Sequence, residues 1–497
     1  MKLYIRLSLI RCLSLLEFKL GIENFIFTVM IVTIMIVKFV NRKWELATLK
    51  NLYQSGKPQL VIVYGRRRTG KTRLLLEFLT EFKGLYFYTP RGGSETVLNE
   101  FSGVVEDRFF PGFRFRDFKT FLEYIFQRLS VGEIIVLDEF QRLTEIDGSI
   151  SLIQKYWDEK CSSHKSMLIL SGSSIGIIRR LALRGDAPLH GRRTFTIEVK
   201  PLKFIDLKEW FPKLSSEDLV KIYGAFGGTP AYLEKIDEKI SVEENIIRLI
   251  LSRGGALYDE PEYLLMEELK VPNRYMDILT AISLGKNTLS EIADFTKINR
   301  ENLTTYLETL KSMKIISREL PVLAKTRRSQ YVILDPFFEF WFRFVRPNKT
   351  ALETGLERKV WINIREEFNT YLGKIFQKIA EEYVIDEVKS GNIDLEADII
   401  GRWWSRNEEI DIIAYSSKRR EGILFEVKWK ELSYNDVKKI ILELIGKSRL
   451  IPEIKEKRYG VIAKRIVDKE KLVEEGCIVK DLNDIVAANP QHNGLPP

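Results

Sequence analysis

A glycine-rich segment near the start of the chain has the residue types that bind phosphate groups. The segment consists of Gly65, Arg66, Arg67, Arg68, Thr69, Gly70, Lys71 and Thr72. Backbone amides of such a turn at a helix N-terminus point at phosphate oxygens, and the helix dipole favours the negative charge held there. We expect Lys71 to reach the β- and γ-phosphates and Thr72 to offer its hydroxyl to Mg²⁺. The segment therefore predicts a site for a nucleoside triphosphate.

Two adjacent acids fit the same site. The apolar residues 134–137 lead directly into Asp138 and Glu139. In a parallel sheet, ligands gather at the carboxyl ends of the strands, which brings these acids to the phosphate loop. We expect Asp138 to hold the Mg²⁺ shell and Glu139 to polarise the attacking water. This pair indicates a hydrolysing enzyme more than a passive nucleotide binder.

Two further residues could act on the γ-phosphate. The apolar residues 167–170 end at Ser171, whose hydroxyl would lie beside the γ-phosphate. An ordinary polar strand end is the alternative interpretation of Ser171. Arg192 is our preferred candidate for the guanidinium that stabilises charge in the transition state.

A second set of charged residues lies near the C-terminus. Residues 409–415 and 422–429 alternate like two half-buried strands. In a hairpin with 415 opposite 422, Asp411 lies directly opposite Glu426, about 5 Å away, and Lys428 shares their face. The two acids repel unless a cation sits between them. Together the three residues suit a metal-bound water that attacks a phosphodiester, with Asp411 and Glu426 on the metal and all three catalytic.

The elements that must position these residues follow from local patterns. A strand at residues 60–64, a helix after the phosphate loop and the two apolar strands predict a parallel α/β sheet. Residues 216–268 are typical of helices around a turn at 227–230. The glycines of this turn could act as the hinge of a lid over the nucleotide. A simple turn between helices is the alternative. Residues 288–295 and 300–310 indicate a helix-turn-helix, with a wing at 315–334.

The helix-turn-helix leaves two interpretations open. Asn302, Thr305 and Lys311 could face a DNA groove, whereas Glu301 and Glu308 oppose phosphate. The basic cluster at residues 325–328 sits at the wing tip. Nonspecific DNA contact and a packing role are both retained. The aromatic stretch 337–344 is expected in the core instead of serving as a base-stacking platform.

Composition narrows the protein class. At 497 residues, 45% apolar and 30% charged, the chain has room for about three domains. A net charge of +9 fits a partner such as nucleic acid or an anionic surface, and a spread of solvated lysines would give the same total. Three distant cysteines predict no disulfide framework and a reducing, cytoplasmic setting. With only three histidines, the chain offers little support for a zinc site with imidazole ligands or for serine-histidine catalysis.

The two ends of the chain carry separate expectations. The apolar residues 25–37 are shorter than the roughly 20 residues that a membrane-spanning helix needs. A membrane anchor and a coding start placed too early, with Met30 or Met35 as the native start, remain the alternatives for residues 1–37. Residues 487–497 are rich in Ala, Asn, Pro and Gly, which predicts a disordered tail.

Several of these motifs together resemble a known family. They are residues 39–42, the strand with Asp138 and Glu139, Ser171 to Ser173, Gly191-Arg192 and residues 223–233. In combination they resemble the archaeal ATPase family, which belongs to the signal-transduction ATPases related to AAA+ proteins. The resemblance covers residues 38 to 350. It implies ATP as the nucleotide and a conformational switch as the use of hydrolysis.

The C-terminal motifs carry a second resemblance. Asp411 with Glu426-Val427-Lys428, and residues 401–404 upstream, resemble the PD-(D/E)XK nuclease superfamily. Residues 360–480 resemble the nuclease-like domain, of the DUF234 type, that follows the ATPase in the archaeal family. This chain departs from the pattern at Gln377, where relatives carry a glutamate that helps to bind metal. An active nuclease, a DNA-binding remnant and a protein-docking module therefore all remain open.

The expected architecture has six parts. They are an extension at 1–37, a P-loop ATPase domain at 38–215, a helical lid at 216–270, a winged helix at 271–345, a PD-(D/E)XK-like α/β domain at 346–486 and a tail at 487–497. We expect an ATP- and Mg²⁺-dependent switch that binds and hydrolyses ATP and is coupled to a DNA-binding, DNA-cleaving C-terminal domain. A regulator or defence sensor with an inactive nuclease fold is the alternative. DNA is the expected partner, and a homo-oligomer is a further option.

Overall fold

The computed structural model describes residues 38–161, 165–269, 271–324, 328–405 and 408–488. The predicted extension at 1–37, most of the wing-tip cluster (325–327) and the tail from 489 onwards lie outside these ranges. The chain divides into two compact units between Lys200 and Pro201, called here the N-terminal unit and the C-terminal unit. The predicted domain boundaries stay predictions. Within the ranges given above, no helix is long and apolar enough to cross a bilayer.

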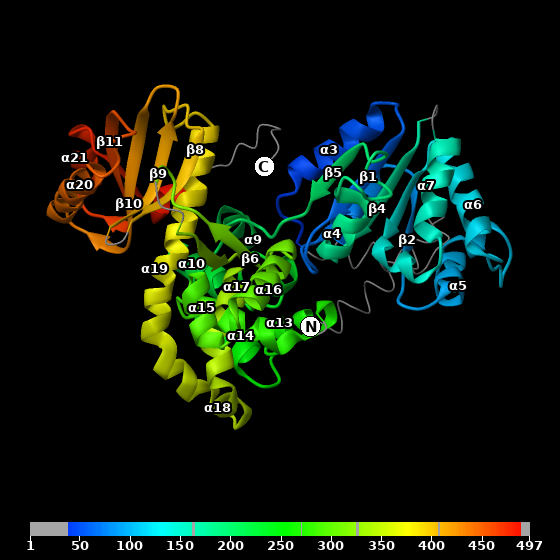
Figure 1. The fold of residues 1–497 in the computed structure, drawn as a ribbon, viewed down its shortest axis with the longest axis horizontal. Coiled ribbons are helices and arrows are strands. Elements are labelled where there is room, and N and C mark those ends of the chain that lie inside the picture. The colour runs from blue at the N-terminus through cyan, green and yellow to red at the C-terminus, as the bar shows by residue number, and fades with distance from the viewer. Residues whose placement is uncertain (1–37, 162–164, 270, 325–327, 406–407, 489–497) are drawn as a thin grey trace. The chain divides into compact units, whose positions relative to one another are not determined.

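The N-terminal unit is built on a five-stranded parallel sheet (Figure 1). Its strands are β1 (Gln59–Tyr64), β2 (Gly84–Tyr88), β3 (Ile134–Asp138), β4 (Met167–Gly172) and β5 (Phe195–Glu198), in the order β2-β3-β4-β1-β5. Strands β3 and β4 are buried along their whole length, as expected of apolar runs covered on both faces. The predicted α/β class is confirmed.

Helices cover both faces of this sheet. Helices α3 (Lys43–Gln54) and α4 (Lys71–Glu81) lie on one face, where Leu49, Leu74 and Phe78 pack on β1, β3 and β4. The other face packs against α5 (Ser94–Val105), α6 (Phe118–Ser130) and α7 (Ser149–Lys160). Shorter helical segments are η1 (Glu106–Arg108), η2 (Phe140–Glu145), α8 (Ile175–Ile178) and η3 (Arg179–Leu183). Side-chain alternation places Asp138 and Ser171 on the face covered by α4, because their strand neighbours two residues back pack there.

The C-terminal unit begins with short helices. They are η4 (Phe204–Asp206), α9 (Leu207–Trp210), α10 (Ser216–Phe226), α11 (Pro230–Leu233), α12 (Val242–Ile246), η5 (Ile247–Leu251) and α13 (Glu260–Glu268). The predicted turn between α10 and α11 is present, and Gly227 has a positive φ of 66°. A Cβ on Gly228 would collide with the Leu202 backbone, whose N–H donates to the Gly228 carbonyl at 2.8 Å. Close packing thus requires glycine here, and the predicted hinge role stays a prediction.

The elements expected of the helix-turn-helix are present. Helices α14 (Pro272–Ser283), α15 (Leu289–Thr296) and α16 (Arg300–Ser312) precede an antiparallel pair, β6 (Ile316–Glu319) and β7 (Gln330–Ile333). Thr288 and Glu291 form a capping box at the start of α15. On α16, Asn302 and Thr305 are exposed, whereas Lys311 is half-buried and pairs with Glu308. The winged-helix assignment and its DNA contact stay predictions.

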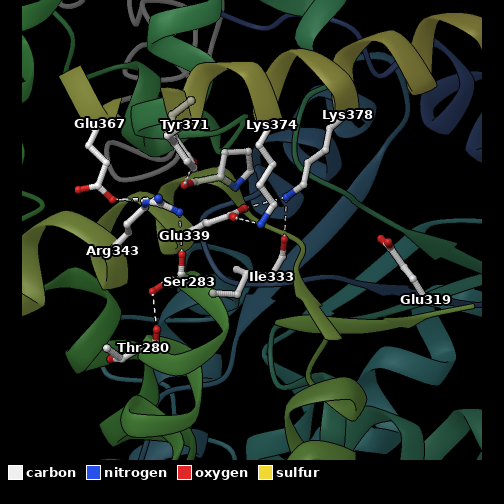
Figure 2. A network of polar contacts seen from close by, with 12 residues as sticks. Thr280, Ser283, Glu319, Ile333, Glu339, Arg343, Glu367, Tyr371, Lys374 and Lys378 are labelled. Carbon is white, nitrogen blue, oxygen red and sulfur yellow. Dashed lines mark hydrogen bonds and ion pairs between the residues drawn. The ribbon is translucent and has the colours of Figure 1, made fainter. Parts of the chain in front are cut away.

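The aromatic stretch after β7 is core, as predicted. It forms α17 (Pro336–Phe340) and η6 (Trp341–Val345), followed by η7 (Arg346–Asn348) and α18 (Lys349–Glu353). Helix α19 (Glu357–Lys389) is the longest element and contacts both α10 and the last sheet (Figure 1). Figure 2 shows Glu339, buried within the aromatic stretch, between the Lys374 and Lys378 ammonium groups of α19. This ion-pair cluster ties α17 to α19.

The chain ends in a mixed five-stranded sheet. Its strands are β8 (Ile399–Trp404), β9 (Glu409–Ser416), β10 (Glu421–Leu432), β11 (Glu456–Ile466) and β12 (Ile478–Asp481). Helices α20 (Tyr434–Ser448), α21 (Lys469–Glu474) and α22 (Leu482–Ala487) accompany it. Strands β8, β9 and β10 are antiparallel, and β10, β11 and β12 are parallel. Tyr415 pairs with Gly422, so the predicted hairpin register is confirmed.

The segment after β6 packs on this last sheet. The Val322 N–H donates to the Arg402 carbonyl of edge strand β8 at 2.9 Å, and the Trp404 indole donates to the Arg328 carbonyl. Val322, Leu323 and Ala324 pack against the cluster of buried residues that includes Trp403 and Ile410. The described part of the predicted wing therefore packs on the last sheet, and both interpretations of the module, DNA contact and a packing role, stay predictions.

Candidate nucleotide site and C-terminal acidic cluster

The phosphate loop connects β1 to α4. Gly65 and Gly70 have φ values of 159° and 92°, and a Cβ on Gly65 would collide with the Val199 carbonyl. Arg68 also lies in the left-handed region, with φ of 67°. The Lys71 ammonium lies 2.9 Å from the Gly65 carbonyl and 2.8 Å from the Arg66 carbonyl. Lys71 thus spans the mouth of its own loop, where phosphate oxygens would replace the carbonyls.

A buried arginine braces the loop from outside. The Arg42 guanidinium donates to the Thr69 carbonyl at 3.0 Å and to the Lys200 carbonyl at 2.6 Å. It also pairs with Glu45, and both side chains are largely buried. The Thr69 hydroxyl donates in turn to the Arg66 carbonyl at 2.9 Å. Residues 39–42 entered the sequence argument only through the family resemblance, and the structure supplies a contact for one of them.

The two predicted metal-shell residues meet. The Thr72 hydroxyl donates to the Asp138 carboxylate at 2.8 Å, and the Tyr86 hydroxyl donates to the same oxygen at 2.5 Å. Asp138 is 2% exposed. Burial, followed by the charge of Asp138, raises the pKa of Tyr86 well above its ordinary value, so the phenol remains a donor. The arrangement presents a carboxylate and a hydroxyl to one point, which are oxygen ligands that suit Mg²⁺.

Glu139 follows with an uncommon backbone. Its φ of 53° is left-handed, a conformation that costs a non-glycine residue of order 1–3 kcal/mol. The Ser173 hydroxyl donates to its carboxylate at 2.7 Å, and the Gln141 amide donates to the same oxygen. A Cβ on Gly172 would collide with Gln141. Two neighbouring side chains therefore hold Glu139 at the carboxyl end of the sheet, as a residue that orients water requires.

Ser171 lies where the sequence placed it, but it has another environment. The side chain is fully buried, and its hydroxyl oxygen has no hydrogen-bond partner within the described residues. Buried hydroxyls are nearly always paired, so this oxygen indicates a group that binds beside it. It lies on the face of the sheet that carries Asp138. The orphaned hydroxyl, the loop amides and the Thr72–Asp138 pair fit a nucleotide with Mg²⁺.

Arg192 is not brought to the phosphate loop by any hydrogen bond or ion pair in the described part of the chain. Its guanidinium instead forms a bidentate pair with Asp158 of α7, at 2.8 to 2.9 Å. Both side chains are partly exposed. The transition-state role assigned to Arg192 stays a prediction, and it requires this pair to open or Arg192 to act on another molecule.

The predicted acidic pair follows the paired part of the C-terminal hairpin, which ends at Ile412 and Phe425, one residue short of Asp411 and Glu426. The Asp411 carboxylate accepts from the Gln377 amide at 2.7 Å and from the Val427 N–H at 2.7 Å. Asp411 is 7% exposed. Burial, followed by the charge of Glu426, raises its pKa to about 6. Gln377, the predicted departure from the nuclease pattern, thus acts here as a donor to Asp411.

Glu426 is held by two lysines. The Lys428 ammonium lies 2.7 Å from the Glu426 carboxylate, and the Lys447 ammonium of α20 lies 3.4 Å from each of its oxygens. Lys447 also donates to the Glu409 carbonyl at 3.0 Å. Burial lowers the pKa of Lys428, but hydrogen bonding and attraction to Glu426 outweigh it and the net shift is upward. Lys428 therefore stays protonated and could orient a phosphate but not remove a proton.

Sequence reasoning missed several of these residues. Tyr86, Gln141 and Lys447 lie outside the motifs, and each reaches its acid through tertiary packing. Period-two alternation could have found Tyr86, because β2 was recognisable as a strand whose neighbour ends at Asp138. No local signal marks Lys447, since it depends on how α20 packs beside β9 and β10.

Two family models match this chain. Residues 39–236 match an "ATPase domain predominantly from Archaea". Residues 341–440 match DUF234, described as "Archaea bacterial proteins of unknown function".

Relatives from Methanocaldococcus jannaschii match as well. An uncharacterized protein is 34% identical over 452 residues, covering 90% of this chain and 99% of that protein. An uncharacterized ATP-binding protein of the same organism is 52% identical over 48 residues, 10% of this chain and 81% of that protein.

Solved structures show a more distant likeness. The Walker-type ATPase of Pyrococcus abyssi matches with a TM-score of 0.47 and 22% identity, over 61% of this chain and 96% of that one. The ORC2 protein of Aeropyrum pernix, solved as ADPNP and ADP complexes, matches with a TM-score of 0.40 and 12% identity, over 65% and 95% of the two chains.

Proposed function

The chain belongs to the archaeal ATPase family that joins an ATPase domain to a C-terminal DUF234 domain, and we propose that it is an ATP-driven switch whose nucleotide state controls DNA binding. The observation that carries the proposal is the meeting of Thr72 and Asp138 beside a complete phosphate loop. Hydrolysis would use residues already held together, and the energy of ATP binding would alter the C-terminal unit.

Each residue of the nucleotide site has a role in this proposal. Lys71 exchanges the Gly65 and Arg66 carbonyls for the β- and γ-phosphates. Glu139, held by Ser173 and Gln141, orients the attacking water. Ser171 donates its unpaired hydroxyl to the γ-phosphate. Because Ser173 and Gln141 orient Glu139, and Tyr86 orients Asp138, these two acids need little reorganisation at the moment of reaction.

Mg²⁺ would be held by Thr72 and Asp138. When bound, it neutralises the developing charge on the phosphate oxygens. The Thr72 hydroxyl must turn its proton away from Asp138 to offer a lone pair to the cation. The Tyr86 phenol would remain on Asp138 and keep its carboxylate oriented.

DNA as the partner is supported by charge and by surface. The chain carries a net charge of +9, which favours a polyanion. Asn302 and Thr305 are exposed along α16, the second helix of the predicted helix-turn-helix. Because the described part of the wing packs on the last sheet, α16 is the element we assign to DNA contact.

The direct test measures ATP binding with and without DNA. We expect saturating duplex DNA to change the Kd of a fluorescent ATP analogue at least fivefold, since coupling between two binding sites is reciprocal. Thr305→Lys should strengthen DNA binding through an added phosphate contact. Lys286→Glu reverses a charge outside α16, and its DNA affinity serves as the comparison. An ATP affinity that is unchanged by DNA which binds the chain would refute the switch.

DNA cleavage is the second candidate, and one observation favours it. Asp411, Glu426 and Lys428 converge within one face of the last sheet, as the nuclease pattern requires. The test measures cleavage of duplex, branched and single-stranded DNA in the presence of Mg²⁺ or Mn²⁺ and compares the intact chain with the Asp411→Ala variant. Cleavage that disappears in the variant would establish this activity.

A homo-oligomer is part of the proposal for Arg192. The guanidinium is partly exposed and paired with Asp158, so in an oligomer it could be delivered to the nucleotide of a neighbouring copy. Mixing Arg192→Ala with Lys71→Ala would show this, because delivery between copies lets the two inactive variants restore a working site in mixed assemblies. A mixture as inactive as either variant alone would argue against delivery between copies.

A further inference from the structure

The acidic cluster of the last sheet differs from a divalent-cation site in how its oxygens are used. Both Asp411 oxygens already accept hydrogen bonds, one from the Gln377 amide and one from the Val427 N–H, each at 2.7 Å. A divalent cation would have to displace these donors from a carboxylate that is 7% exposed. Displacing both donors from a buried carboxylate is costly.

The charge balance also disfavours a divalent cation. Lys428 and Lys447 both pair with Glu426, and the charge of Lys428 also acts on Asp411. The four side chains sum to zero, whereas Mg²⁺ and Mn²⁺ are held by an excess of negative oxygen ligands.

Three features of the structure hold the Lys447 side chain in this position. It lies in the last turn of α20, where the helix dipole favours a cation. Its ammonium reaches the Glu409 carbonyl at 3.0 Å and both Glu426 oxygens at 3.4 Å. Its side chain is only 22% exposed. The Glu426 carboxylate is therefore already paired with two cations that the chain itself supplies, Lys428 and Lys447.

We infer that Lys447 takes the place of a metal ion on Glu426, and that Gln377, as a donor to Asp411, completes this metal-free arrangement. This inference opposes the cleavage candidate given above, and Mn²⁺ binding decides between the two. The inference goes beyond the proposed switch and does not depend on it, because it concerns the affinity of this cluster for a cation, which is measurable without ATP or DNA.

The first experiment titrates Mn²⁺ into the nucleotide-free full chain and measures free Mn²⁺ by electron paramagnetic resonance. We expect no Mn²⁺ site that depends on Asp411 at concentrations up to 1 mM, on the order of physiological divalent-ion levels. A submillimolar site in the wild type that disappears in Asp411→Ala, and persists in Asp138→Ala, would overturn the inference.

The second experiment restores the missing ligand and removes the internal cation. The double variant Gln377→Glu with Lys447→Met should gain one Mn²⁺ site, at least tenfold tighter than any binding to the wild type. Adding Asp411→Ala should remove it. Lys439→Met, an exposed lysine of the same helix, is the matched control and should gain nothing. A correctly folded double variant, checked by its thermal melt, that gains no site would contradict the role given to Lys447 and Gln377.

Discussion

The Thr72 hydroxyl lies 2.8 Å from the Asp138 carboxylate, although 66 residues separate them in the chain. The contact joins the first turn of α4 to the end of β3, and it places the two residues expected around Mg²⁺ at one point. Tyr86 holds Asp138 from the adjacent strand. Helix α4 and the adjacent strands β3 and β2 thus supply the three side chains that meet at this point.

Lys71→Ala should lower the rate of ATP hydrolysis at least about 100-fold, because one positioned donor to developing negative charge is worth 10²–10³ in rate. Phosphate release measures it. The control is Lys50→Ala, which removes a surface pair with Glu81 and should leave the rate unchanged. A Lys71→Ala chain that retains more than a tenth of the wild-type rate would show that the predicted loop does not hold the phosphates.

Glu139→Gln should bind ATP normally and lower the single-turnover rate by about 10²–10⁴, the usual contribution of a general base. The amide oxygen can still accept from Ser173, so the backbone conformation should persist. Ser173→Ala should lower the rate about tenfold with little change in KM, since Ser173 only positions Glu139. Equal losses of ATP affinity and rate in both variants would instead indicate a collapsed site.

Asp411→Asn should stabilise the C-terminal unit at pH 7 but not near pH 4. The folded-state pKa of Asp411 is raised to about 6 from 3.8, chiefly by burial and then by Glu426. Below pH 3.8 both states are protonated, and the free energy of unfolding falls as pH rises from about 4 to 6. At 1.36 kcal/mol per pKa unit, the variant recovers up to about 3 kcal/mol.

Urea unfolding at several pH values measures this recovery. The Asn oxygen can still accept from the Val427 N–H, and Gln377 can turn its amide oxygen toward the new donor. Asp468→Asn, at an exposed position, should show no pH-dependent gain. A variant destabilised equally at pH 4 and pH 7 would mean that the Asp411 hydrogen bonds outweigh the cost of its charge.

Glu339→Gln should destabilise the C-terminal unit by about 3 kcal/mol at neutral pH, because breaking a buried ion pair leaves charges unpaired. Burial alone would raise the pKa of Glu339, but Lys378 and Lys374 outweigh it and lower the pKa to about 2 (Figure 2). The stabilisation is present above pH 4.5 and is lost as pH falls toward 2. The variant should therefore lose less stability on acidification than the wild type.

Glu367→Gln provides the comparison for this cluster. Glu367 pairs with Arg343 at 2.9 Å, but its side chain is 51% exposed, so its loss should cost little. Denaturant unfolding between pH 2 and pH 7 compares the two variants. Equal effects of the two substitutions would show that burial does not set the strength of these pairs.

Local patterns carried much of the prediction. The phosphate loop, the strand ending at Asp138 and the pairing of Tyr415 with Gly422 follow from spacing and alternation, which act between near neighbours or across one short turn. The buried aromatic stretch was predicted from hydrophobicity alone. These features depend little on how distant segments pack.

The remaining features depend on distant packing. The pair between Arg192 and Asp158 joins residues 34 positions apart, and Lys447 reaches Glu426 from a helix that follows it in the chain. The sequence predicted that the acids at 411 and 426 need a cation. It could not tell a metal ion from a lysine, because the side chain that fills the position belongs to another element.

The central claim, that nucleotide state controls DNA binding, is tested most directly by fluorescence anisotropy of a labelled duplex at one fixed salt concentration. Glu139→Gln loaded with Mg²⁺ and ATP is compared with the wild type loaded with ADP, and Lys71→Ala serves as the nucleotide-insensitive control. We predict at least a fivefold difference in Kd between the two loaded states, and no nucleotide effect on the control. Equal DNA affinity in both states, or no DNA binding in either, would contradict the account.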